Sequence, residues 1–143
     1  MATDFPGMSV EDANRRLPLV RVIVKDAVEL RADVTARQER LLALRDSYPE
    51  GDLADPYAEE VLQMEQSLEI DEERVAGFAD ELRQLGAELV DPAAGLVEFP
   101  SAQDGEAIRL SWMYNEPEVS YWRAESELPS DRRPLVLTGQ QAG

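Results

Sequence analysis

The sequence predicts an α+β fold: a long antiparallel helical hairpin over about residues 9–47 and 56–85, followed by a small antiparallel β-sheet over about residues 87–123. Three observations predict it. Apolar residues recur every three or four positions through both helical stretches, a cluster of turn-forming residues separates the stretches, and beyond Gly86 the apolar residues alternate instead. With 143 residues, the chain is expected to form a single domain that ends in an extended arm over residues 124–143.

The first predicted helix begins at a capping box. Ser9 precedes Asp12 by three residues, a spacing that lets each side chain accept a hydrogen bond from the other residue's backbone N–H. Pro18 lies a little over two turns into the helix and has no backbone donor, so it predicts a kink or a short lead-in segment. The apolar stripe of this helix comprises Val10, Ala13, Leu17, Val20, Val24, Ala27, Val34 and Leu41, and Ile23, Leu30 and Leu44 widen it.

The second predicted helix follows a breaker cluster at residues 48–52, which contains a proline and a glycine. Asp55 is placed to cap this helix and Pro56 to occupy its first position. Gly86 directly follows the last apolar position and is expected to be the C-cap. The stripe of the second helix comprises Val61, Met64, Leu68, Val75, Phe78, Ala79, Leu82 and Leu85.

The two stripes fit each other when the chain folds back at about residues 51–52, because apolar positions then meet at each level. The same register places Arg31 opposite Glu72 and Gln38 opposite Glu65, so the polar interruptions of the two stripes coincide. We expect the Arg31–Glu72 pair to fix the register of the hairpin more than to stabilise it, since desolvation offsets much of the attraction of a buried ion pair.

Charge also favours this pairing. Residues 9–45 carry eight basic and six acidic side chains, whereas residues 46–82 carry thirteen acidic side chains and one basic. Two helices of this length cannot bury both sides of their stripes alone, so we predict a homodimer in which hairpins or sheets associate.

Beyond Gly86 the pattern predicts three or four short antiparallel strands. Residues 91–95 form a turn, and Pro100 is expected to end the strand before it. Asp104-Gly105 is a hairpin signal between two alternating runs. The expected strands cover residues 87–90, 96–99, 107–114 and 119–123.

Composition excludes several function classes. The chain has no His and no Cys, which removes the commonest general base, thiolate chemistry and cysteine–zinc sites. Its formal net charge of −16 argues against binding to a phosphate backbone, so no nucleic-acid partner is expected. The first residues lack the pattern of a signal peptide and no stretch is apolar enough to span a membrane, so a cytoplasmic protein without a membrane or cofactor is expected.

Four aromatic residues lie within eleven positions: Trp112, Tyr114, Tyr121 and Trp122. We favour a core role for this cluster, because a small sheet needs large side chains to bury. The alternative is a binding platform. Since Tyr121 and Trp122 are adjacent in a predicted strand, their side chains must point to opposite faces.

Charged residues offer weaker signals. The acidic run at residues 69–73 has carboxylates at one-turn spacing, but it is more typical of a solvated helix face than of a metal site. Arg123, Arg132 and Arg133 could receive a carboxylate or phosphate, although pairing with nearby acids is favoured. The nearby acids are Glu116, Glu118, Glu125 and Glu127.

The order of several short motifs resembles the bacterial DUF2203 family over about residues 8–135. These motifs are Val10-Glu11-Asp12-Ala13-Asn14-Arg15-Arg16-Leu17-Pro18-Leu19, Leu85-Gly86-Ala87-Glu88-Leu89, Asp91-Pro92, Gly95-Leu96-Val97-Glu98-Phe99-Pro100, Trp112, Glu116-Pro117-Glu118-Val119, Tyr121-Trp122 and Arg132-Arg133-Pro134-Leu135. The resemblance implies no assigned activity. Family members often have His where this chain has Arg123, and Gly where it has Asn115. Glu116 and Arg132 match the family pattern, and we expect them to form an ion pair that closes the sheet onto the C-terminal arm.

These observations favour a non-catalytic protein-interaction or structural module that forms a homodimer or binds an unidentified protein partner. The alternative is a carboxylate-based metal or small-ligand site between the sheet and the helices. The candidate ligand-binding residues are Glu98, Glu116, Glu118, Tyr121, Trp122, Arg123 and Arg132. No catalytic residue and no dedicated metal ligand is predicted.

Overall fold

The computed structural model describes residues 7–47 and 56–135 and confirms the predicted α+β fold. The predicted turn at residues 48–52, the predicted cap at Asp55 and the end of the arm over residues 136–143 lie outside the described residues. Over the described residues the chain forms two long helices and then a five-stranded sheet, with a 3-10 turn before the last strand. Its elements are α1 (Val10–Ser47), α2 (Pro56–Gln84), β1 (Glu88–Asp91), β2 (Leu96–Gln103), β3 (Glu106–Met113), β4 (Tyr121–Ala124), η2 (Pro129–Asp131) and β5 (Arg133–Pro134).

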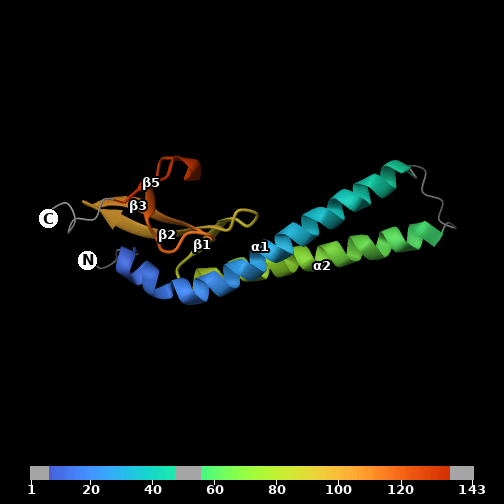
Figure 1. Ribbon diagram of the computed structural model, residues 1–143, viewed down its shortest axis with the longest axis horizontal. Helices are drawn as coiled ribbons and strands as arrows, with labels where there is room; N and C mark the ends of the chain where they lie inside the picture. The colour runs from blue at the N-terminus through green and yellow to red at the C-terminus, as the bar shows by residue number, and fades with distance from the viewer. Residues whose placement is uncertain (1–6, 48–55, 136–143) are drawn as a thin grey trace.

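Helix α1 begins at the predicted capping box. The Asp12 N–H donates to Ser9 Oγ at 3.0 Å, and the Ser9 N–H donates to the Asp12 carboxylate at 3.4 Å. The helix is continuous through Pro18, and its N-terminal part lies at an angle to the rest, as a proline in a helix interior predicts (Figure 1).

The sheet covers only the open end of the hairpin, and the other half of the hairpin projects beyond it (Figure 1). This projecting half buries a small apolar seam of Val34, Leu41 and Leu68, flanked by Leu30, Val61 and Met64. Within one chain these three buried side chains are no more than 7% exposed, because long charged side chains close the seam on both sides.

The ion pairs along the seam confirm the predicted register in one place and correct it in another. Arg31 donates two hydrogen bonds of 2.9 Å to the two carboxylate oxygens of Glu72, as predicted. The prediction that Gln38 meets Glu65 is wrong: Gln38 donates to Glu72 at 3.0 Å, and Glu65 pairs with Arg45. Because Arg45 pairs with Glu65, Gln38 reaches instead to the carboxylate that Arg31 also binds, so positions opposite each other in the register need not pair.

Helix α2 ends at Gly86 in a Schellman motif. The Gly86 N–H donates to the Arg83 carbonyl at 3.0 Å, and the Ala87 N–H donates to the Leu82 carbonyl at 2.9 Å. Gly86 has φ +79°, and a Cβ there would lie 2.5 Å from the Met8 side chain. The positive φ therefore favours glycine, whereas the contact with the flexible end of the Met8 side chain could be relieved by a shift of that side chain.

The sheet is an antiparallel meander with strand order β1-β2-β3-β4-β5. The predicted Asp104-Gly105 turn joins β2 to β3, with φ of 52° and 82° at these residues. The prediction that Pro100 ends its strand is wrong, since β2 continues to Gln103. The pairing of β1 with β2 stops at Glu98, so no strand pairs with Pro100 on that edge of β2. The Pro100 carbonyl points to this edge and accepts from the Met8 N–H at 2.9 Å. The proline nitrogen faces the same edge, so its missing N–H removes no hydrogen bond between strands.

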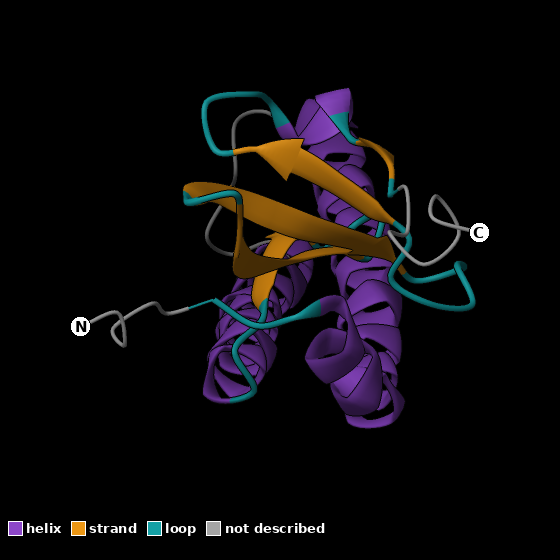
Figure 2. Cartoon of the chain, turned by 90° about the vertical axis from the view of Figure 1, so that its left-hand side faces the viewer, coloured by secondary structure: helices purple, strands orange, loops and turns teal. Residues whose placement is uncertain are grey.

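The C-terminal arm also departs from the prediction. Instead of remaining extended from Pro129, it forms the 3-10 turn η2 and then the fifth strand β5 beside β4. The helices cover one face of the sheet, which we call the inner face, and the turn η2 lies on the side away from the helices, the side of the outer face (Figures 1 and 2). On the inner face, strand side chains such as Phe99, Leu110 and Trp112 form one buried cluster with Leu17 and Val20 of α1.

Candidate functional site

The outer face of the sheet carries a buried ion pair between β2 and β4. Arg123 donates from Nε and Nη2 to the two oxygens of Glu98 at 2.7 and 2.8 Å, and Glu98 is 1% exposed. Hydrogen bonding to Glu98 raises the pKa of Arg123 above its ordinary value. The remaining Nη1 group of Arg123 donates to the carbonyls of Ala124, Glu125 and Glu127, so this guanidinium joins β2 to the turn that follows β4. The prediction that Arg123 pairs with an acid close in sequence is wrong, since its partner Glu98 lies on β2.

A second pair confirms the expected link between Glu116 and the arm. Arg132 Nη2 donates to both Glu116 oxygens, at 2.7 and 2.8 Å. The same carboxylate accepts from the Met113 N–H at 2.9 Å, and the Arg132 guanidinium lies 3.9 Å from the centre of the Tyr121 ring. Glu116 therefore accepts three hydrogen bonds from the protein itself, and the arm packs on Tyr121 through Arg132.

The aromatic cluster divides as predicted. Trp112 is fully buried in the core, and Trp122 packs against the same core cluster on the inner face. Arg133 lies 4.6 Å from the centre of the Trp122 ring and pairs with Glu127. Tyr121, on the outer face, contacts Arg132, so the aromatic side chains serve packing more than they form one exposed platform.

The structure therefore does not bring the seven predicted ligand residues into one pocket. Glu98 with Arg123, and Glu116 with Arg132, form two separate pairs, whereas Glu118 is exposed on the loop before β4. Within residues 7–47 and 56–135, the acidic side chains form no group of three or more that could hold a metal ion. The metal or small-ligand alternative stays a prediction, because the described residues do not gather its candidate ligands at one site.

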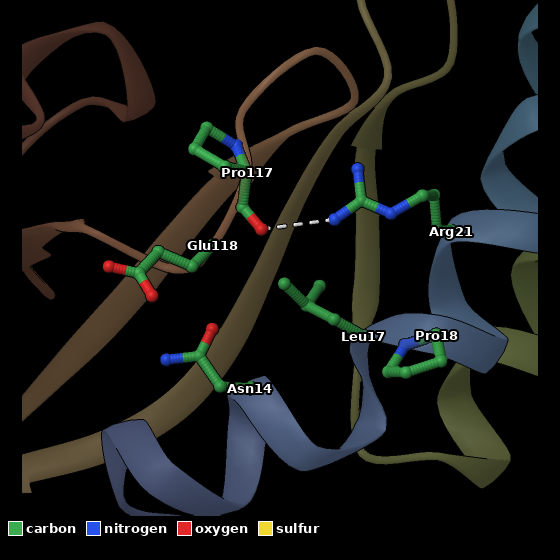
Figure 3. Close-up of a pocket in the computed structure, with 6 residues that line it drawn as sticks. All are labelled: Asn14, Leu17, Pro18, Arg21, Pro117 and Glu118. Atoms are coloured by element: carbon green, nitrogen blue, oxygen red, sulfur yellow. Dashed lines mark hydrogen bonds between the residues drawn. The ribbon is translucent and has the colours of Figure 1, made fainter.

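Glu118 borders an open hollow of about 500 Å³ between α1 and the loop before β4 (Figure 3). Asn14 and Arg21, which sequence reasoning did not select, hold this loop in place. The Val119 N–H donates to Asn14 Oδ1 at 2.7 Å, and Arg21 Nη2 donates to the Pro117 carbonyl at 3.1 Å. Arg21 also donates to the carbonyls of Tyr114 and Glu116. Two segments that carry the family resemblance thus meet here, and their polar groups bind each other.

A different surface lies between the helices at the open end of the hairpin. We call it the hairpin groove, an open hollow of about 370 Å³. Ile23 and the half-buried Phe78 and Leu85 form its floor, while Leu19 and Val22 are 54% and 58% exposed beside it. The groove is lined by Leu19, Val22, Ile23, Asp26, Phe78, Glu81, Gln84 and Leu85.

The position of the groove follows from rows of α1 side chains seven residues apart. One row, of Val24, Arg31 and Gln38, lies on the flank that the sheet covers at the open end of the hairpin. Farther along, the hydrogen bonds of Arg31 and Gln38 to Glu72 close this flank. On the other flank lies the row of Ile23, Leu30 and Arg37.

This second flank is closed by polar contacts in the projecting half of the hairpin and is open at the other end. Arg37 closes it in the projecting half by donating to Ser67 at 2.9 Å and to Asp71 at 2.5 Å. At the open end no such pair closes it within the described residues; apolar side chains reach the surface instead. Sequence reasoning missed the groove because Leu19 and Val22 fall outside the buried stripe, although their spacing beside Ile23 was the available signal.

No described helix has an apolar stretch long enough to cross a membrane. The chain matches no curated protein and no solved structure. A family model described as "Uncharacterized conserved protein (DUF2203)" matches residues 8–135, which span both helices and the whole sheet. The chain therefore belongs to the DUF2203 family.

Proposed function

We propose that this chain is a non-catalytic protein-interaction module whose hairpin groove binds a helical segment of another protein. The observation that carries the proposal is the exposure of Leu19 and Val22 beside the apolar floor of the groove. Side chains of this type, gathered along one exposed flank of a helix pair, are typical of a surface that receives an amphipathic helix.

The size of the groove suits such a segment. From Leu19 to Asp26 the wall on α1 rises about 10 Å, or about two helical turns. Burying the exposed halves of Leu19 and Val22 would contribute about 1 kcal/mol each, since full burial of such a side chain contributes roughly 1.5–3 kcal/mol. Affinity would also depend on the floor residues, whose remaining exposed area a partner would cover.

The groove lies on a rigid support, which favours binding without a large ordering cost. Arg16 donates to the Leu85 carbonyl at 2.9 Å and so joins the start of α1 to the end of α2. Arg21 and Asn14 attach α1 to the loop between β3 and β4.

Site-specific photo-crosslinking tests the proposal. A photoreactive amino acid replaces Val22 in one variant and Ile70 in a matched control, because these side chains are 58% and 59% exposed, both apolar and both helical, but only Val22 lines the groove. We expect a discrete adduct with another protein in cells from position 22 and none from position 70.

The proposal fails if the two positions give equal adducts or if neither gives one. An adduct of twice the mass of the chain, formed at position 22, would assign the groove to the homodimer predicted from the sequence and would also overturn the proposal of a different partner. Light scattering on the purified chain measures that homodimer independently.

A further inference from the structure

We infer that the segment bound in the hairpin groove is basic: an amphipathic helix whose apolar anchors are flanked by Lys or Arg. This inference rests on the proposed function and names the chemistry of its partner. The first observation is the charge of the groove's rim. Asp26 on α1 and Glu81 on α2 are both exposed beside the apolar floor, and within the described part of the chain neither carboxylate forms an ion pair.

The second observation is the charge of the surrounding surface. Helix α2 carries nine acidic and two basic side chains, and the basic ones, Arg74 and Arg83, are both paired with acids on their own helix. Helix α1, the other wall of the groove, carries eight basic and seven acidic side chains, so the negative field comes from α2 and from the whole chain, whose formal net charge is −16. A negative field of this extent attracts a cationic segment from a distance and opposes an acidic one.

The same charges disfavour a second copy of the chain as the occupant. In a two-fold contact between identical grooves, each groove meets its own copy, so the acidic rims of two copies would face each other. Like charges placed together across an interface cost free energy that the small apolar floor would have to offset. A basic helix avoids this repulsion, since its apolar face covers the floor while its cations face Asp26 and Glu81.

The test uses the purified full chain and three fluorescein-labelled synthetic peptides of about 14 residues, or roughly four helical turns. The first has Leu at positions i, i+3, i+4 and i+7, with Lys at the flanking positions. The second replaces each Lys with Glu. The third keeps the composition of the first but scrambles the positions of its Leu residues. Fluorescence anisotropy measures the Kd of each at low and at physiological salt.

We expect the Lys peptide to bind at least about tenfold more tightly than either of the other two, with a Kd that rises with salt. Reversing the rim charges in the double variant D26K/E81K should weaken its binding about tenfold, because each reversal replaces an attraction with a repulsion.

The matched control is E69K/E73K, which changes the net charge equally at exposed acids of α2 that do not line the groove. We expect this control to change the Kd by less than about twofold at physiological salt, where the field of distant charges is screened. All four positions are exposed, so circular dichroism should show unchanged folding.

Three results would overturn the inference: equal binding of the Glu peptide, equal binding of the scrambled peptide, or an equal loss in E69K/E73K, which would mean diffuse attraction instead of recognition at the groove. If the Lys peptide fails to bind while position 22 still crosslinks to another protein, the inference is wrong and the proposed function stands. If position 22 forms no adduct, the proposed function itself is wrong.

Discussion

Replacing Glu98 with Ala should destabilise the protein strongly. The carboxylate is 1% exposed and accepts two hydrogen bonds, of 2.7 and 2.8 Å, from Arg123, whose side chain is itself 12% exposed. Glu98→Ala leaves that guanidinium buried without its counter-ion, and breaking a buried pair in this way costs about 3–5 kcal/mol. At an unfolding entropy of roughly 2.1 cal/mol/K per residue, a loss of this size lowers the Tm by about 10 °C or more.

Urea unfolding, followed by the fluorescence of the two tryptophans in the sheet, measures the loss. Glu88→Ala is the matched control, because Glu88 also accepts from an arginine at 2.7 Å on the outer face but is 51% exposed, and exposed pairs contribute at most about 1 kcal/mol. Glu98→Ala and Arg123→Ala together should cost less than the sum of the two single losses. A Glu98→Ala variant no less stable than Glu88→Ala would refute the reasoning.

Three further predictions concern single sites. Ser111→Ala should leave the Tm unchanged or slightly raised, since the Ser111 hydroxyl is fully buried and finds no hydrogen-bond partner among the described residues; a drop of several degrees on calorimetry would reveal a partner. Gly86→Ala should lower the free energy of unfolding in urea by about 1 kcal/mol or more, because a Cβ is disfavoured at φ +79° and would displace the end of the Met8 side chain; an unchanged value would mean that α2 ends differently. Hydrogen bonding to Arg37 lowers the pKa of Asp71, so this pair should stabilise the fold above the unfolded pKa of Asp, about 3.9, and should lose that contribution as the pH falls through the pKa of the folded state. Arg37→Gln should therefore reduce the dependence of the free energy of unfolding on pH in that acidic range. A dependence of unchanged slope would contradict this.

Local patterns predicted much of the backbone. The capping box, the glycine at the end of α2 and the Asp104-Gly105 turn are short-range signals whose geometry depends on few residues, and each is found as predicted. The Arg31–Glu72 pair was also predictable, because a short loop and two matched stripes leave one register in which the polar gaps coincide.

Features that depend on distant segments were harder to predict. Pro100 remains in its strand because a neighbouring strand stops before it and Met8 arrives from the other end of the chain, which no pattern around Pro100 shows. Arg123 pairs with Glu98 because antiparallel neighbours bring them to one face, whereas sequence reasoning considered only nearby acids. Likewise, the groove depends on which flank of the hairpin the sheet covers, and the helical pattern alone does not show that Leu19 and Val22 lie on the open flank.

The central claim, that the hairpin groove is the docking surface, is tested most directly by methyl NMR. The chain has three isoleucines, in three environments: Ile23 lines the groove, Ile70 is exposed on α2, and Ile108 is buried on β3 in the core. In a sample labelled at isoleucine methyl groups, adding the Lys peptide should shift the Ile23 signal and leave those of Ile70 and Ile108 in place. A shift at Ile70 with none at Ile23 would contradict the account.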